Sequence, residues 1–248
     1  MRDKYFSGMP KIEYDVKGDG NGKTVTNILK RVGVRKNLEE HLTNYYKEIN
    51  TDASRPEMLA FENYRDANAH WILMLINNVV DPYYDWVLDP RALDEIIQKK
   101  YPNKVIQLPS NYYTGGGKLF QKGEKISDGS QEKTVLYFDA DLRQITIDAT
   151  PSYSDGATIT GASSSASFTW NSNLLINERS AVHHYEKPDP NDSTKGSGII
   201  VSSSYSGAVA IGNDEYETNK NEEKRNISIV SMGNVPTIEE NYLEEIQK

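Results

Sequence analysis

The sequence predicts an α+β protein built from several small modules. Two short helical segments followed by a third occupy part of its first half, whereas the residues after Pro109 show the alternation typical of strands. The hydrophobic fraction is 37% and the charged fraction 26%, which is lean for one large core in a chain of 248 residues. The expected parts are an N-terminal extension (1–44), a helical module (45–109), a small β domain (110–186), and a linker with an extended C-terminal arm (187–248).

The N-terminal extension contains two candidate ordered segments. Residues 12–16 are predicted as a short strand, and a Gly-rich turn at 17–23 leads to a second segment at 25–34. Tyr5 and Phe6 belong to a small apolar patch near the terminus, which we expect to dock on another part of the protein.

The helical module is predicted from two segments that cannot be stable alone. A strand at 45–49 is followed by a short amphipathic segment that starts at Arg55, and residues 69–77 are apolar nearly all round. Helices of this length are marginal in water, so we expect them to bury their apolar faces against each other. The polar residues 66–68 should break the chain between them.

Local signals mark where the helices begin. Ser54 is predicted as an N-cap, with Pro56 near the first helical position and Glu57 at the spacing of a capping box. Asp89-Pro90 should open the third helix, over residues 91–100.

The β domain is predicted from composition and from a weak repeat. Residues 110–186 are rich in Gly, Ser, Thr and β-branched side chains, which favours a small barrel or sandwich. One turn-plus-strand unit occurs twice with the same spacing, in Phe120, Gly123, Ile126 and in Tyr153, Gly156, Ile159. Residues 187–198 indicate a loop or linker, 199–211 one or two strands, and 219–248 a charged helical tail.

Charge and composition exclude several classes of function. The net charge of −8, with acids interleaved among the bases, argues against nucleic-acid binding. The longest apolar run falls far short of the roughly 20 residues of a membrane-spanning helix. No apolar stretch follows Arg2 and Lys4, so we expect no signal peptide. The absence of cysteine excludes disulfides and Cys-based zinc sites, and fits assembly in a reducing cytoplasm.

No motif in the sequence predicts catalysis or a cofactor. Residues 18–24 end in Gly-Lys-Thr like a P-loop, but the spacing requires a glycine where Lys17 stands, so a hairpin turn is the better account. His183 and His184 should point to opposite faces of a strand and chelate a metal poorly. Asp139 and Asp141 lack the rest of a calcium loop. The acidic residues and the serines define no hydrolase site.

Aromatic residues are the candidates for binding. Trp71, Tyr83, Tyr84 and Trp86 suit a sugar-stacking surface or, as the simpler interpretation, the packing of a core and an interface.

The segment Arg55–Trp86 resembles the baseplate wedge subunit of contractile-tailed, T-even-like bacteriophages, called gene product fifty-three. The matching elements are Arg55-Pro56-Glu57, Leu59-Ala60, Tyr64, His70-Trp71, Asn77 and Asp81-Pro82-Tyr83-Tyr84-Asp85-Trp86. Stretches at the start (Tyr5-Phe6 to Pro10, Tyr14-Asp15, 25–32) and in the tail (Tyr216-Glu217, 221–227) are similar to its longer members. The helix pair also resembles a LysM module, a βααβ unit best known for binding peptidoglycan.

The resemblance implies a non-enzymatic structural protein of the virion, assembled in the host cytoplasm. Its implied partners are the iris-forming wedge core, the sheath-initiating subunit and the central hub, with several copies in a sixfold baseplate. The interface candidates are Tyr5, Phe6, Trp71, Tyr83, Tyr84, Trp86, Tyr216, Asn221 and Arg225, and 221–227 is a candidate partner-binding arm. The alternative is a LysM protein that binds peptidoglycan beside a lytic enzyme. A receptor-binding role rests only on the β domain.

Overall fold

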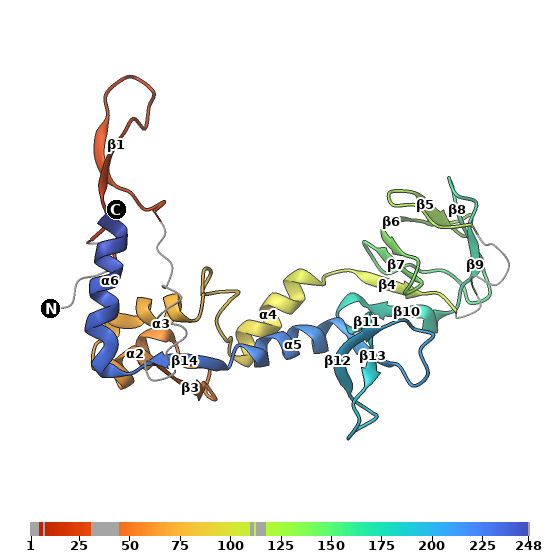
Figure 1. Ribbon diagram of the computed structural model, residues 1–248. Helices are drawn as coiled ribbons and strands as arrows, with labels where there is room; N and C mark the ends of the chain where they lie inside the picture. Colours follow the sequence, from red (N-terminus) through yellow and green to blue (C-terminus); the bar gives the residue numbers. More distant parts are fainter. Residues whose placement is uncertain (1–4, 7, 31–44, 110–111, 113–117, 248) are drawn as a thin grey trace. The chain divides into compact units, whose positions relative to one another are not determined.

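The computed structural model describes residues 5–6, 8–30, 45–109, 112 and 118–247. It confirms a mixed α+β protein and divides the chain into two compact units (Figure 1). Unit 1 comprises Met1–Asp89 and Asn221–Lys248, and unit 2 comprises Pro90–Lys220. The boundaries of these two units do not coincide with those of the four segments expected from the sequence. The four segments remain a prediction.

Unit 1 begins with the hairpin of β1 (Lys11–Tyr14) and β2 (Lys23–Thr26), antiparallel with Ile12 opposite Val25. The Asp15 carboxylate closes its loop by accepting hydrogen bonds from the backbone N–H groups of Lys17 (3.0 Å), Gly18 (2.7 Å) and Gly20 (2.7 Å). The Gly-Lys-Thr sequence therefore lies in a hairpin, as predicted. Most of the second expected segment, 25–34, lies beyond this strand, and its residues 31–34 are outside the described residues.

The rest of unit 1 is a strand–helix–helix arrangement whose second strand comes from the far end of the chain. β3 (Tyr45–Ile49) precedes α2 (Pro56–Tyr64), the short helix η1 (Ala67–Ala69) and α3 (His70–Ile76). β14 (Asn226–Val230) pairs antiparallel with β3, with Asn226 opposite Ile49. The strand and both helices predicted for this segment are confirmed.

The helix ends show one wrong prediction. Residue 55, and not Ser54, is the N-cap of α2, and its side chain makes no capping hydrogen bond. The Ser54 backbone is engaged elsewhere: its N–H donates to Oδ1 of Asn50 (2.7 Å) and its carbonyl accepts from Nδ2 of Asn50 (2.9 Å). At the other end Arg65 adopts a left-handed φ of 57°, and Asp66 caps η1 by accepting from the Asn68 N–H, so the predicted break is confirmed.

The C-terminal residues belong to the core of unit 1. After β14 come η4 (Met232–Asn234) and α6 (Val235–Gln247). The core joins residues from both ends of the chain: Met9, Leu59, Ala60, Tyr64, Ala69, Trp71, Ile72, Leu73, Trp86, Val87, Ile227, Ile229, Val230, Val235, Ile238, Tyr242 and Ile246. The expected extended arm is therefore corrected, because Ile227 and Ile229 alternate on a strand and the apolar residues of α6 recur at helical spacing. The helical tail is confirmed.

Unit 2 starts with α4 (Pro90–Lys100) and is dominated by a curled, seven-stranded antiparallel sheet (Figure 1). The strand order is β10-β4-β7-β6-β5-β8-β9. In chain order these strands are β4 (Lys104–Gln107), β5 (Lys125–Ser127), β6 (Glu132–Asp139), β7 (Gln144–Ile147), β8 (Thr158–Gly161), β9 (Ser167–Thr169) and β10 (Leu175–Asn177), with η2 (Ser172–Leu174) before β10. The core consists of Ile106, Leu108, Phe120, Ile126, Val135, Ile145, Ile147, Tyr153, Ile159, Ala166, Phe168 and Trp170.

The weak sequence repeat corresponds to two similar turn-plus-strand units in the structure. Gly123 and Gly156 both have a positive φ, 85° and 87°, which glycine adopts without strain. The isoleucines that follow each of them, Ile126 and Ile159, are fully buried on the paired strands β5 and β8. Each unit therefore turns at its glycine and inserts its isoleucine into the same core.

Unit 2 also holds a second, smaller sheet. After η3 (Glu178–Ser180), β11 (Val182–Pro188) pairs antiparallel with both β12 (Gly196–Val201) and β13 (Val209–Gly212). α5 (Asn213–Glu223) follows. The predicted linker 187–198 is mostly the short turn between β11 and β12, in which the Asp189 N–H donates to the Lys195 carbonyl (2.9 Å). In the part of the chain that the structure describes, no helix is long and apolar enough to cross a membrane.

Candidate protein-interface sites

The segment Val80–Trp86, which we call the aromatic turn, is held by its own two aspartates. One carboxylate oxygen of Asp85 accepts the N–H groups of Val80 and Asp81, both at 2.9 Å. The Asp81 carboxylate accepts the Tyr83 N–H (2.9 Å), and the Asp81 carbonyl accepts the N–H groups of Tyr84 (3.1 Å) and Asp85 (2.7 Å). The hydrogen bonds from Asp81 and Val80 lower the pKa of Asp85. The carboxylate is therefore favoured in its charged, accepting form.

The aromatic side chains of this turn face in two directions. Trp86 is only 5% exposed, and its indole N–H donates to the Ser54 carbonyl at 3.0 Å. Tyr83 and Tyr84 are 74% and 63% exposed. Trp86 thus anchors the turn in the core of unit 1, while the two tyrosines are presented to solvent on a braced backbone.

Asn221 and Arg225 brace the same region from the C-terminal segment. Asn221 is buried; its amide donates to the Leu88 carbonyl (3.0 Å) and accepts the Leu88 N–H (2.9 Å). The Arg225 guanidinium donates to the carbonyls of Asn50 (3.0 Å) and Thr51 (2.7 Å). These two predicted interface residues therefore make contacts within unit 1. Next to them, the Lys224 ammonium donates to the Tyr84 carbonyl.

A second aromatic group joins the N-terminus to α6. The Tyr5 ring lies 5.7 Å from Trp71 and 5.0 Å from Tyr242, and the Tyr242 hydroxyl donates to the Tyr5 carbonyl at 2.8 Å. Burial, followed by the electrostatic interaction and the hydrogen bond with Tyr5, raises the pKa of Tyr242. Phe6 packs edge-on against Tyr5 at 5.1 Å and remains exposed. The apolar N-terminal patch therefore docks on unit 1.

Tyr242 was missed by sequence reasoning, although a signal for it exists. Val235, Ile238, Tyr242 and Ile246 recur at helical spacing and form the buried face of α6. The many charged residues of the tail make this apolar stripe hard to recognise in the sequence.

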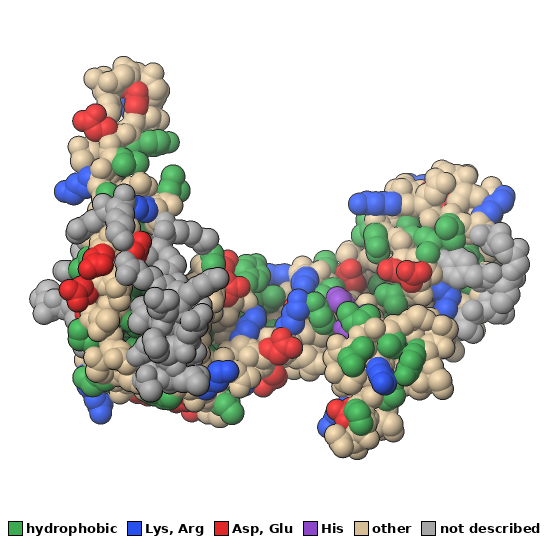
Figure 2. All heavy atoms as spheres, in the orientation of Figure 1, with side chains coloured by type: hydrophobic (Ala, Val, Ile, Leu, Met, Phe, Trp, Pro, Cys, Tyr) green, Lys and Arg blue, Asp and Glu red, His purple; other side chains and the backbone are tan. Residues whose placement is uncertain are grey.

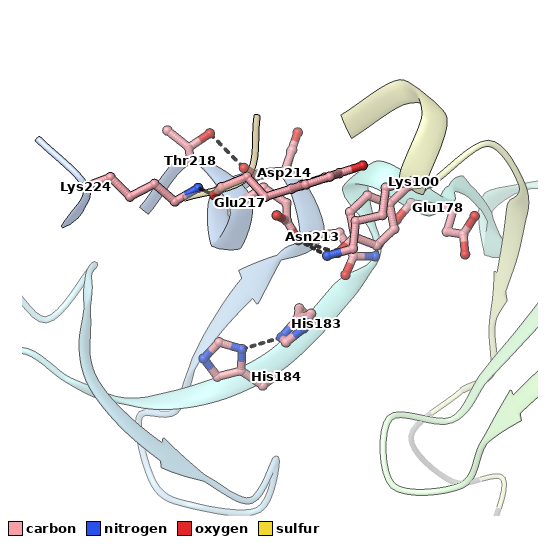
Figure 3. A network of polar contacts seen from close by, with 11 residues as sticks. Lys100, Glu178, His183, His184, Asn213, Asp214, Glu217, Thr218 and Lys224 are labelled. Atoms are coloured by element: carbon pink, nitrogen blue, oxygen red, sulfur yellow. Dashed lines mark hydrogen bonds and ion pairs between the residues drawn. The ribbon is translucent and has the colours of Figure 1, made fainter. Parts of the chain in front are cut away.

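Tyr216, the remaining candidate, lies in a polar cluster of unit 2. Its ring stacks on His183 at 3.8 Å with an interplanar angle of 14°, and the Lys220 ammonium lies 4.4 Å from the ring centroid. The sequence predicts that His183 and His184 point to opposite faces, and this is wrong. A register shift in β11 between Val182 and His184 turns both rings to the same side, with their Nδ1 atoms 2.8 Å apart (Figure 3).

An ion pair lies beside the histidines. The Lys100 ammonium of α4 donates to Glu217 at 2.5 Å, and the Tyr101 hydroxyl donates to the same oxygen at 2.8 Å. Burial alone would raise the pKa of Glu217, but these two hydrogen bonds bring it below its usual value. Burial raises the pKa of Tyr101 to about 12.

Within the described ranges, no three His, Cys, Asp or Glu side chains are grouped so that they could hold a metal ion. Apolar side chains reach the surface over the hairpin β1–β2 and over the three-stranded sheet, as Figure 2 shows. The features that stand out are exposed aromatic residues on small, internally braced modules. Such residues are typical of the class of proteins that act by binding other proteins.

A comparison with protein families identifies the assembly in which such a protein acts. Residues 5–120 match the family described as base plate wedge protein 53. The chain is therefore similar to that family over just under half of its length, and this match confirms the resemblance at Arg55–Trp86. It is a structural protein of the bacteriophage tail baseplate in the virion, and associates with other baseplate components. The comparison with curated proteins gives no match.

Proposed function

We propose that this protein joins neighbouring wedges around the central hub during baseplate assembly. Its partners are the iris-forming wedge core and the sheath-initiating subunit, with several copies in each sixfold baseplate. The observation that carries this proposal is the aromatic turn: two exposed tyrosines on a backbone fixed by Asp81, Asp85 and Trp86.

The physical argument is preorganisation. Binding costs the freedom of every group that it orders, so an anchor held in place beforehand loses less than a flexible one. Tyrosine is enriched at interface hot spots because it buries a large ring and keeps a polar tip. Exposed tyrosines on an ordered turn therefore suit a permanent protein contact.

The arrangement of β3, α2, α3 and β14 supports the LysM-like reading of unit 1. Two antiparallel strands with two helices between them in sequence make a βααβ unit, and α3 contacts β14 through Asn77. Residues 77–225 then form an insertion before the closing strand. The peptidoglycan-binding alternative is not favoured, because the matched family is one of baseplate wedge proteins.

The test is complementation of a phage that lacks the gene with the double variant Tyr83→Ala, Tyr84→Ala. We expect wedges that sediment separately and few closed hexagonal baseplates. The matched control is Tyr137→Ala, which removes an exposed tyrosine from unit 2. If baseplates close normally with the double variant, the aromatic turn does not join the wedges. Retention of the purified protein on peptidoglycan would favour the LysM alternative.

A further inference from the structure

The three-stranded sheet of unit 2 has almost no apolar core of its own. Among the described residues, neither apolar core includes a side chain from β11, β12 or β13. Within these strands only Ile211 is a buried hydrophobic residue. Among the described residues, neither apolar core therefore joins this sheet to α5.

A row of hydrogen-bonded side chains on β11 leads to a contact with α5. Oε1 of Glu186 lies 2.8 Å from Nε2 of His184, and Nδ1 of His184 lies 2.8 Å from Nδ1 of His183. The His183 ring then stacks on Tyr216 of α5. The other oxygen of Glu186 accepts the Gly198 N–H at 2.6 Å, which ties β12 to the same chain.

The charged and titratable groups around the pair come from three elements. β11 contributes Glu186, α5 contributes Tyr216, Glu217 and Lys220, and α4 contributes Lys100. Burial lowers the pKa of His183, and the charge of His184 lowers it further; Lys100 and Lys220 act in the same direction, and Glu217 opposes them. The net environment favours a neutral His183.

We propose that His183 and His184 form a proton-sensitive latch that holds the three-stranded sheet on α5 and releases it when His183 gains a proton.

The hydrogen-bond inventory of imidazole explains the switch. One hydrogen bond between two Nδ1 atoms needs one N–H donor and one bare acceptor. When His184 alone carries the extra proton, it donates from Nε2 to Glu186 and from Nδ1 to His183, so both hydrogen bonds remain. When His183 is protonated as well, two N–H groups face each other at hydrogen-bond distance and both rings carry a positive charge. The pair must then separate, and the stack on Tyr216 is disturbed with it.

The direction of the pH dependence follows from the lowered pKa. The folded chain binds the proton on His183 less readily than the unfolded chain does. The latch therefore contributes its full stability above the ordinary histidine pKa of 6.5. That stability is lost as the pH falls from 6.5 through the lowered value.

The test is hydrogen exchange of the full chain at several pH values between about 8 and about 5, in steps of about one unit, which span the range where histidine titrates. The labelling times are scaled to correct for the intrinsic effect of pH on the exchange rate. We expect exchange in β11 and in the start of α5 to accelerate roughly tenfold for each unit by which the pKa is lowered. The paired strands β6 and β7 of the same unit should keep their protection. Unchanged exchange of β11 across this range would overturn the latch.

Two variants distinguish the effect of protonating His183 from the effect of the side chain itself. His183→Phe keeps a ring to stack on Tyr216 and cannot titrate, and His183→Gln keeps hydrogen-bonding groups without a titration. In either variant that folds, the acceleration at low pH should disappear. His70→Gln, in unit 1, is the matched control and should behave as the unmodified protein. An acceleration that persists in the His183 variants contradicts the proposal.

Discussion

The indole N–H of Trp86 donates a 3.0 Å hydrogen bond to the carbonyl oxygen of Ser54, 32 residues earlier in the chain. This bond ties the end of the aromatic turn to the start of α2. It makes the position of the exposed tyrosines depend on the core of unit 1.

Replacing Trp86 should destabilise unit 1. Trp86→Phe loses this hydrogen bond and part of the buried ring, and we expect a loss of about 1–3 kcal/mol in the free energy of unfolding. Trp86→Ala should cost about 3–5 kcal/mol, because it also opens a cavity. Urea unfolding followed by circular dichroism measures both. Tyr83→Ala, which removes an exposed ring, should stay within about 0.5 kcal/mol.

The order of the aromatic turn should depend on pH through Asp85. Its folded pKa is lowered from 3.8, so its contribution is present above that value and is lost as the pH falls through the lowered one. Hydrogen exchange of Val80 and Asp81 should therefore accelerate under acid conditions. Asp85→Asn should show fast exchange already at neutral pH, and equal protection of both proteins there would contradict this role.

Asn77 should be important for joining α3 to the closing strand. Its amide donates to the Ser228 carbonyl (2.9 Å) and accepts the Ser228 N–H (2.7 Å), as a neighbouring strand would. Asn77→Ala leaves both backbone groups unpaired, at an expected cost of about 1–3 kcal/mol. Thermal or urea unfolding checks this value against Asn191→Ala in an exposed turn. A cost no larger than that of the control would show that Ser228 finds other partners.

Unit 1 should fold without unit 2 but not without its own C-terminal segment. The Leu88 backbone and Asn221 are joined by two hydrogen bonds, so a short Gly/Ser linker can replace residues 90–220. We expect this excised protein to unfold cooperatively with a buried Trp71. A chain cut after residue 220 loses β14 and α6 and should fail to form the core. Cooperative unfolding of the cut chain would contradict the assignment of these elements to unit 1.

Local features of the sequence predicted local structure well. The short helices of residues 55–77, the break after Tyr64 and the repeat around Gly123 and Gly156 depend on nearest neighbours and on periodicity. These signals are strong wherever apolar residues recur at a fixed spacing. The hairpin at Lys17–Lys23 was predicted because one missing glycine excluded a P-loop.

Long-range pairing could not be predicted in the same way. Nothing in residues 226–230 indicates that their partner is β3 at Tyr45–Ile49, so the sequence predicts an arm where the structure has a core strand. The His183–His184 contact depends on a register shift in β11, which overrides the simple alternation of a strand. The Ser54 cap failed because Asn50 holds the backbone of Ser54 in another arrangement.

The most direct measurement for the wedge-joining proposal is electron microscopy of baseplates from an infection with phage that lack this gene. The proposal predicts separate wedges, no closed hexagons and no assembled tails, with closure restored when the protein is supplied from a plasmid. Complete hexagonal baseplates and tails in the absence of the protein would contradict it.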